Sequence, residues 1–230
     1  MKIKILVTGA SRGIGAAIVD AFNPDAFDVV GLSTRDGDLA DSLVPSRLWH
    51  DAIQRLGGHV DVLINNAGVF DSNPLDSGEK DWLESWNRTM QINLTASAAL
   101  CRLAVLQWKE TKRHGRIVNI ASRAAYRGDS PEHWHYAASK AGMVAMTKTI
   151  ARGYASDGIL AFAICPGFTM TGMAEDYLAS RGGEKLLADI PLGKVADPEE
   201  VAAIAKFCAV DAPPSMTGAV LDVNGASYVR

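Results

Sequence analysis

The sequence is poor in cysteine, in charge of one sign and in long hydrophobic runs, and each shortage excludes a class of protein. Its three cysteines, Cys101, Cys165 and Cys208, are widely spaced and form no C-x-x-C pair, which argues against a disulfide framework or a zinc knuckle. With 23 basic and 26 acidic side chains, the net charge of −3 offers no basic excess to nucleic acid or anionic lipid. The longest uninterrupted apolar run, Ile159 to Cys165, is far shorter than the ~20 residues of a membrane helix.

The start of the chain shows no targeting segment, because Gly9 interrupts the apolar run from Met1 to Val7 before a signal-peptide core could form. We therefore expect a cytoplasmic protein with neither nucleic acid nor a membrane as partner. The 230 residues, 48% hydrophobic and 21% charged, have the composition of an ordinary globular protein. This length suits a single domain over residues 1–230.

Short apolar runs typical of buried strands alternate with helix-length segments along the chain. This alternation predicts a parallel sheet covered by helices on both faces. Strands are expected at 3–7, 27–32, 60–64, 116–120, 159–165 and 219–223, and helices at 14–22, 81–112, 136–156 and 197–209.

The segment 168–196 breaks this alternation, with glycines and Pro191 scattered among charged residues. A long insertion in a compact domain is usually functional. We expect a substrate loop or lid with short helices here, and the alternative is a plain surface connection.

A glycine-rich loop follows the first expected strand and precedes a helix, in the order Gly9, Gly13, Gly15. Glycines at such a point allow a tight turn and the close approach of a pyrophosphate, and the helix N-terminus then offers free N–H groups. A purely structural turn is the alternative. The loop predicts a dinucleotide site formed by Gly9, Ser11, Arg12, Gly13, Ile14 and Gly15.

The end of the second expected strand favours NADP(H) over NAD(H). An NAD site often has an acidic residue about 20 positions past the loop. Here Ser33, Thr34 and Arg35 stand instead, and hydroxyls with a guanidinium suit a 2′-phosphate. Arg12 is a second candidate for the same phosphate. The alternative is two solvated arginines, with Asp36 competing for Arg35.

Tyr136 and Lys140 are four residues apart, so they share one face of the expected helix. A nearby ammonium favours phenolate, so we expect the tyrosine pKa to fall from its reference value of ~10. Such a phenol exchanges a proton with a carbonyl or alcohol oxygen. Ser122, at the end of a strand, can hydrogen-bond the same oxygen as its charge develops.

Several motifs occur in a defined order, and together they resemble the short-chain dehydrogenase/reductase family, in particular its 3-oxoacyl-[acyl-carrier-protein] reductase-like branch. The resemblance covers nearly the whole chain. It rests on Thr8 to Gly15, Asn65-Asn66-Ala67-Gly68, Asn93, Ser122, Tyr136-x-x-x-Lys140 and Pro166-Gly167. It implies a Rossmann-type doubly wound α/β domain of about seven mostly parallel strands with helices on both faces.

The resemblance also implies a role for each member of the catalytic set Asn93, Ser122, Tyr136 and Lys140. Tyr136 would be the acid/base, and Ser122 would orient or polarise the substrate. Lys140 would bind the nicotinamide ribose and tune the tyrosine, and Asn93 would hold a water in a proton relay.

Further cofactor contacts follow from the same resemblance. Small residues after the third strand would leave room for adenosine, a pair near position 38 would flank the adenine, and the end of the fifth expected strand would lie beside the nicotinamide. The positions are Asp38, Leu39, Asn65, Ala67, Gly68, Pro166, Gly167, Thr169 and Thr171, together with Tyr136 and Lys140.

The chain departs from the family pattern after the second strand, where the connection is compact and a helix is expected to be missing. His133-Trp134-His135, just before Tyr136, is a candidate pocket wall or an ordinary loop; no third ligand is evident, so we expect no metal. Relatives often form dimers or tetramers through helices near 95–112 and 136–156, which implies a homodimer or homotetramer.

The sequence therefore predicts an NADPH-dependent reductase of a small-molecule carbonyl compound, or the reverse alcohol dehydrogenase, with a 3-oxoacyl thioester as one candidate substrate. One alternative is an NAD(P)-dependent sugar or polyol dehydrogenase. Another is a dinucleotide sensor without catalysis, which would need only the glycine loop.

Overall fold

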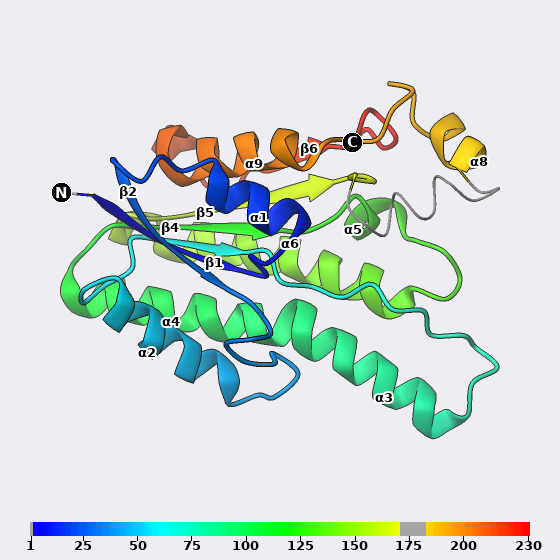
Figure 1. Ribbon diagram of the computed structural model, residues 1–230, viewed down its shortest axis with the longest axis horizontal. Helices are drawn as coiled ribbons and strands as arrows, with labels where there is room; N and C mark the ends of the chain where they lie inside the picture. Colours follow the sequence, from blue (N-terminus) through cyan, green and yellow to red (C-terminus); the bar gives the residue numbers. More distant parts are fainter. Residues whose placement is uncertain (1, 171–182) are drawn as a thin grey trace.

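The computed structural model describes residues 2–170 and 183–230. This part of the chain forms a parallel six-stranded sheet in the order β2-β1-β3-β4-β5-β6 (Figure 1). The strands are β1 (Ile3–Thr8), β2 (Phe27–Leu32), β3 (Val62–Asn65), β4 (Gly115–Ile120), β5 (Ile159–Pro166) and β6 (Val220–Val223).

Helices cover both faces of the sheet, so the predicted doubly wound α/β architecture is confirmed. Helices α1 and α9 lie on one face, and α2, α4 and α6 lie on the other (Figure 1). The helices are α1 (Gly13–Asp20), α2 (Val44–Arg55), α3 (Glu79–Met90), α4 (Ala96–Thr111), α5 (Ala124–Arg127), α6 (Trp134–Tyr154), α8 (Gly183–Ala188) and α9 (Pro198–Lys206). Shorter turns are the π-helices Gln91–Thr95 and Phe207–Asp211 and the 3-10 helices Ala155–Asp157 and Pro214–Met216.

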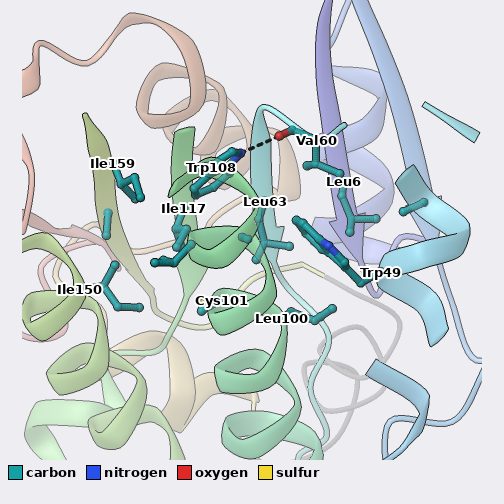
Figure 2. Packing of buried hydrophobic residues seen from close by; sticks show 14 of the residues in the cluster. Leu6, Trp49, Val60, Leu63, Leu100, Cys101, Trp108, Ile117, Ile150 and Ile159 are labelled. Carbon is teal, nitrogen blue, oxygen red and sulfur yellow. Dashed lines mark hydrogen bonds between the residues drawn. The ribbon is translucent and has the colours of Figure 1, made fainter. Parts of the chain in front are cut away.

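The core on the α2/α4/α6 face is built around Trp108, which is fully buried. Its indole Nε1 donates a hydrogen bond to the carbonyl oxygen of Val60 at 2.6 Å, which links α4 to the segment just before β3 (Figure 2). A Cβ at Gly115 would lie 2.1 Å from the Trp108 ring. The first residue of β4 therefore has to be glycine for the indole to pack against the strand.

The connection after β2 and the number of strands were both predicted incompletely. No helix separates Arg35 from Asp38, as their spacing of three residues led us to expect, but a helix that was not predicted, α2, follows at Val44–Arg55. The described sheet has six strands rather than about seven, and β2 is its edge. The signal for α2 was present in the spacing of Leu48, Ala52 and Leu56, which all face the core.

The sheet has its topological switch point between β1 and β3. The chain leaves β1 toward β2 on one side, whereas β3 to β6 continue on the other. In doubly wound sheets, ligands bind in the crevice at this point, beyond the carboxyl ends of the strands. The ends of β1, β3, β4 and β5, at Thr8, Asn65, Ile120 and Pro166, share this edge.

The longest helical stretch, Glu79–Thr111, is long and apolar enough to cross a membrane by length and composition alone. Half of its most apolar 18-residue window is buried within the protein. Its C-terminal part, α4, packs on the sheet through Leu100, Ala104 and Trp108. Its apolar character is therefore accounted for by the core.

The expected lid at 168–196 lies partly outside the described residues, which omit 171–182. At its near end Thr169 forms an isolated parallel bridge with Ala196, and the Met170 N–H donates to the Ala196 carbonyl at 2.8 Å. The short helix α8 lies in its second half.

Candidate active site

The glycine loop has the geometry of a tight strand-to-helix turn. Gly9 and Gly13 have φ angles of +66° and +53°, a region that glycine adopts without strain. A Cβ at Gly15 would lie 2.0 Å from the Gly9 carbonyl oxygen, so no side chain fits where α1 packs on the loop. The glycines therefore allow the tight turn and the close packing of α1 that a dinucleotide-binding loop requires.

The loop after β3 is tied to the glycine loop across the switch point. The Asn66 side-chain amide donates to the carbonyl oxygens of Thr8 and Gly9 at 3.1 and 3.0 Å. In the same direction, the backbone N–H groups of Asn66 and Ala67 donate to Thr8 Oγ1, both at 3.1 Å. Two expected cofactor segments thus form one rigid edge of the site.

Asn65 has a structural use that its place in the motif did not reveal. Its side chain is fully buried, and its Nδ2 donates to Asn119 Oδ1 at 2.8 Å. Asn119 in turn donates to Thr147 Oγ1 on α6 at 2.8 Å. The amide nitrogen therefore links β3, β4 and α6, whereas Asn65 Oδ1 is buried without a hydrogen-bond partner among the described residues.

The expected 2′-phosphate site lies at the end of β2. The Ser33 N–H and hydroxyl both bind Asp36 Oδ2, at 2.8 and 3.3 Å. Asp36 pairs with Arg55 at 3.5 Å rather than with Arg35. Arg35 and Arg12 are exposed, and within residues 2–170 and 183–230 neither has an ion-pair partner. Two guanidinium groups therefore stay available to a phosphate.

The expected adenine pair is placed just beyond. Asp38 is exposed, and its carboxylate accepts the Ala40 N–H at 2.9 Å in a local turn. Leu39 is half-buried against the core, and its carbonyl accepts from Gln91 Nε2 at 3.3 Å.

Tyr136, Ser122 and Lys140 converge beyond the end of β4. The Lys140 ammonium donates to the Ile120 carbonyl at 2.9 Å and lies 5.7 Å from the centroid of the Tyr136 ring. Burial raises the pKa of Tyr136 to about 12, and a hydrogen bond with the Ser122 side chain opposes that rise. Burial also lowers the pKa of Lys140 to about 8.

The tyrosine pKa thus corrects a sequence-based expectation. The ammonium was expected to lower it, but desolvation of the phenolate outweighs any attraction to Lys140 in the protein alone. The phenol is protonated at neutral pH, which suits a group that gives a proton to a carbonyl oxygen.

Asn93 lies in the π-helical turn Gln91–Thr95, where the chain passes the site. Its Oδ1 accepts the Val69 N–H at 2.8 Å, and its Nδ2 donates to the Val69 carbonyl at 3.0 Å and to Ser139 Oγ at 3.3 Å. A Cβ at Gly68 would lie 3.3 Å from Asn93 Oδ1 and 3.5 Å from Lys140 Nζ. Gly68, Asn93 and Lys140 are therefore brought together as the motif order predicted.

The end of β5 is equally confined. A Cβ at Gly167 would lie 2.8 Å from Asn224 Cβ. The backbone N–H of Gly167 donates to the carbonyl oxygen of Val223 at 2.9 Å. Thr169 is buried, and its hydroxyl donates to the Gly167 carbonyl at 3.3 Å. Thr171, the other expected contact, lies outside the described residues.

An aromatic wall flanks the tyrosine, and sequence reasoning identified only part of it. Phe70 stacks on His133 with ring centroids 3.9 Å apart and meets Tyr136 edge-on at 4.7 Å. His135 is buried, and its Nδ1 accepts the Tyr136 N–H at 2.9 Å. No group of three or more metal-ligating side chains occurs in the described chain. His133 thus stacks on Phe70 beside Tyr136, and Phe70 was missed although it follows the Asn-Asn-Ala-Gly motif closely.

Comparisons with known proteins agree with this geometry. Residues 35–226 match a family model described as Enoyl-(Acyl carrier protein) reductase. The chain is 34% identical over 241 aligned residues to proteins of Vibrio cholerae and Escherichia coli named 3-oxoacyl-[acyl-carrier-protein] reductase, with 97% of this chain and 96% of each relative covered. A Synechocystis protein of the same name is 35% identical, with 96% and 94% covered.

A solved structure of an aldohexose dehydrogenase from Thermoplasma acidophilum superposes with a TM-score of 0.86 at 26% sequence identity, covering 100% of this chain and 95% of that one. Fold, motif order and overall similarity agree over nearly the full length. The chain therefore belongs to the short-chain dehydrogenase/reductase family and is an NAD(P)-dependent oxidoreductase acting on carbonyl and hydroxyl groups.

Proposed function

We propose that this protein reduces a carbonyl compound with NADPH, or oxidises the alcohol in reverse, with 3-oxoacyl compounds as a substrate class. The observation that supports this most is the convergence of Tyr136, Ser122 and Lys140 at the edge of the sheet where the glycine loop also lies. The names of the bacterial relatives support the 3-oxoacyl class.

The residues of the glycine loop fit a dinucleotide, because a Cβ at Gly9 or Gly15 would fill the turn. NADPH, when bound, supplies the hydride for the substrate carbon. Tyr136 gives its phenolic proton to the substrate oxygen, since burial keeps that proton in place at neutral pH. Ser122 donates a hydrogen bond to the same oxygen as negative charge develops there.

Lys140 and Asn93 restore the proton in this proposal. Burial lowers the pKa of Lys140 to about 8, so near neutral pH its ammonium can both hold a proton and release it close to the phenol. Both ends of the Asn93 amide are engaged by Val69 and Ser139. Its main-chain carbonyl, within the π-helical turn, accepts the Ser97 hydroxyl at 3.5 Å, and its second lone pair would hold the relay water. Widened turns of this kind occur frequently at functional sites.

The preference for NADPH rests on Arg12 and Arg35. Both are exposed at the end of the site where a 2′-phosphate would lie, and Asp36 is already bound by Ser33 and Arg55. A guanidinium pair there favours a phosphate over a ribose hydroxyl.

Replacing the proton donor tests the reaction. We expect Tyr136→Phe to bind NADPH like the wild type, by cofactor fluorescence, and to lose at least about 100-fold in kcat, the usual contribution of a positioned general acid. Tyr154→Phe, at the far end of the same helix, is the matched control and should keep its turnover. Near-native turnover of Tyr136→Phe would remove the tyrosine from this role.

A substrate panel separates the alternatives. Turnover of ketoesters and 3-oxoacyl thioesters supports the proposal, whereas exclusive turnover of sugars would favour the aldohexose dehydrogenase activity for which the Thermoplasma protein is named. Tight NADPH binding with no turnover of any carbonyl compound would indicate a sensor.

We also propose a single cytoplasmic domain over 1–230 that assembles as a homodimer or homotetramer, with 168–196 closing over the substrate. The long helices α4 and α6 are the proposed contact surfaces. Sedimentation of the protein alone and with NADPH tests the assembly.

A further inference from the structure

Arg123 is a buried cation next to the site that the proposed reaction does not use. It follows Ser122 directly and precedes α5, and its side chain is only 10% exposed. Arginine is almost never buried to this degree unless a carboxylate or another anion neutralises it.

The described chain neutralises Arg123 incompletely. Asp189 contacts it at 3.5 Å, but the same carboxylate oxygen lies closer to Arg127, at 2.7 Å. Asp129 is the other acidic group that acts on Arg123, and its effect is weaker. Asp129 is exposed and accepts the Ser130 N–H at 2.8 Å. Two guanidinium groups therefore share one well-placed carboxylate.

Among the described residues, the other contacts of Arg123 are with an aromatic ring and with backbone. Its Cζ lies 5.4 Å from the centroid of the Phe168 ring, and its N–H donates to the Pro166 carbonyl at 2.9 Å. Both contacts come from the segment that leaves β5 beside the proposed nicotinamide position. Burial and the neighbouring Arg127 lower the pKa of Arg123, and Asp189 and Asp129 oppose that shift.

We propose that Arg123 binds the carboxylate of the substrate, and that this substrate is a short oxo acid whose carbonyl oxygen faces Ser122 and Tyr136. The proposal rests on the proposed function, namely carbonyl reduction through Tyr136, and assigns as substrate a free 3-oxo acid rather than its ester or thioester. Arg123 follows Ser122 directly, and its guanidinium lies against Phe168, just beyond the end of β5, on the side of the sheet where ligands bind in doubly wound folds.

A carboxylate suits Arg123 because a guanidinium binds it through two parallel hydrogen bonds. Asp189 already lies nearer to Arg127, so an incoming carboxylate can take over Arg123 while Asp189 stays paired. A neutral substrate would leave the buried cation as poorly compensated as before.

The experiment compares acetoacetate with methyl acetoacetate, which present the same ketone with and without a negative charge. We expect the wild type to prefer acetoacetate in kcat/KM. Arg123→Met should lose at least about 10-fold on acetoacetate, the usual effect of losing a charged hydrogen bond, and change less than about threefold on the ester. Arg123→Lys should recover part of the loss, and Arg102→Met, an exposed arginine on α4, should lose nothing.

A binding measurement accompanies the kinetics. Calorimetric titration of acetoacetate into the protein with NADP⁺ should give binding for the wild type and none for Arg123→Met.

Equal losses of kcat/KM on both substrates would assign Arg123 a structural role and overturn the proposal, as would a wild type that does not bind acetoacetate. If that wild type still reduces the ester through Tyr136, the proposed function stands while this inference fails. If acetoacetate binds through Arg123 but neither ketone is reduced, the anion site stands and the proposed reaction fails.

Discussion

The Lys140 ammonium donates a hydrogen bond to the main-chain carbonyl of Ile120 at 2.9 Å, which places a buried cation beyond the end of β4. The Ile120 carbonyl is an uncharged partner, and burial lowers the pKa of Lys140 to about 8. Protonated Lys140 is therefore poorly solvated in the folded protein. Placing this charge beside Tyr136 lowers the free energy of unfolding.

Removing this charge should stabilise the protein and inactivate it. As pH falls from 10.5 toward 8, the unfolded chain takes up a proton that folded Lys140 does not, so stability falls and stays reduced below pH 8. At pH 7 we expect Lys140→Met to gain about 2–3 kcal/mol in urea denaturation, at 1.36 kcal/mol per pKa unit, less the lost hydrogen bond. This gain in stability should shrink at pH 9.5.

The control is Lys148→Met, which changes an exposed lysine on the same helix and should alter neither stability nor turnover. A Lys140→Met protein no more stable than the wild type would contradict the account.

Removing Arg35 should weaken NADPH binding selectively. Arg35 is exposed beyond β2, where we place the 2′-phosphate. We expect Arg35→Ala to raise the Kd for NADPH by about 10- to 100-fold, the cost of a lost charged hydrogen bond, and to leave NADH binding within about twofold. Arg47→Ala is the control, because Arg47 is engaged by Asp51 at 3.6 Å. Equal weakening of both cofactors by Arg35→Ala would show that this residue does not read the phosphate. Fluorescence titration measures all of these constants.

The strands were predictable because their apolar character is local. The run ending at Cys165 is buried at every position, and the structure places β5 there. Helix α2 escaped detection because its core-facing residues, such as Leu48 and Ala52, are interspersed with polar and charged ones, so the segment has no continuous apolar run. The sequence also predicted about seven strands, whereas the described sheet has six and ends at β2; this order becomes visible only in the folded chain.

The members of the site were predictable, but their electrostatics were not. Motif order identified Tyr136, Lys140 and Ser122, since spacing and type are visible in a sequence. The raised pKa of Tyr136 depends on how many atoms surround the phenol, which only the folded chain determines. The contact of Phe70 with Tyr136 likewise joins distant segments of the chain, so no local pattern indicates it.

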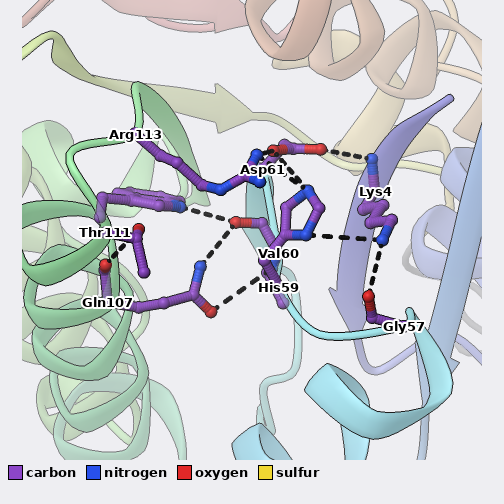
Figure 3. A network of polar contacts seen from close by, with 9 residues as sticks. Lys4, Gly57, His59, Val60, Asp61, Gln107, Thr111 and Arg113 are labelled. Carbon is purple, nitrogen blue, oxygen red and sulfur yellow. Dashed lines mark hydrogen bonds and ion pairs between the residues drawn. The ribbon is translucent and has the colours of Figure 1, made fainter. Parts of the chain in front are cut away.

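Acid should destabilise the protein through His59. The imidazole contacts Lys4 Nζ at 3.4 Å, Arg113 at 3.2 Å and Asp61 at 3.3 Å (Figure 3). Burial lowers its pKa, and the two cations lower it further against the opposing effect of Asp61. The folded state therefore favours neutral His59, so stability is complete above about pH 6.5, the unfolded value, and falls as the pH drops below it.

The matched variants for this prediction are His59→Gln and His50→Gln. We expect His59→Gln to flatten the loss of thermal stability between pH 7 and pH 5. The exposed His50 has no such surroundings, so His50→Gln should retain the loss. A wild-type profile that is flat over this interval would contradict the assignment.

A methyl group should have opposite effects at two helical glycines. A Cβ at Gly15 would lie 2.0 Å from the Gly9 carbonyl oxygen and 2.5 Å from Asn66 Nδ2, whereas a Cβ at Gly153 would meet nothing within 4 Å. We expect Gly15→Ala to lose about 1–3 kcal/mol by overpacking, and to lose NADPH binding because the loop must shift. Gly153→Ala should gain up to about 1 kcal/mol from helix propensity and bind NADPH normally. Urea denaturation and cofactor fluorescence measure both effects; unchanged NADPH binding by Gly15→Ala would mean that the tight turn is not part of the cofactor site.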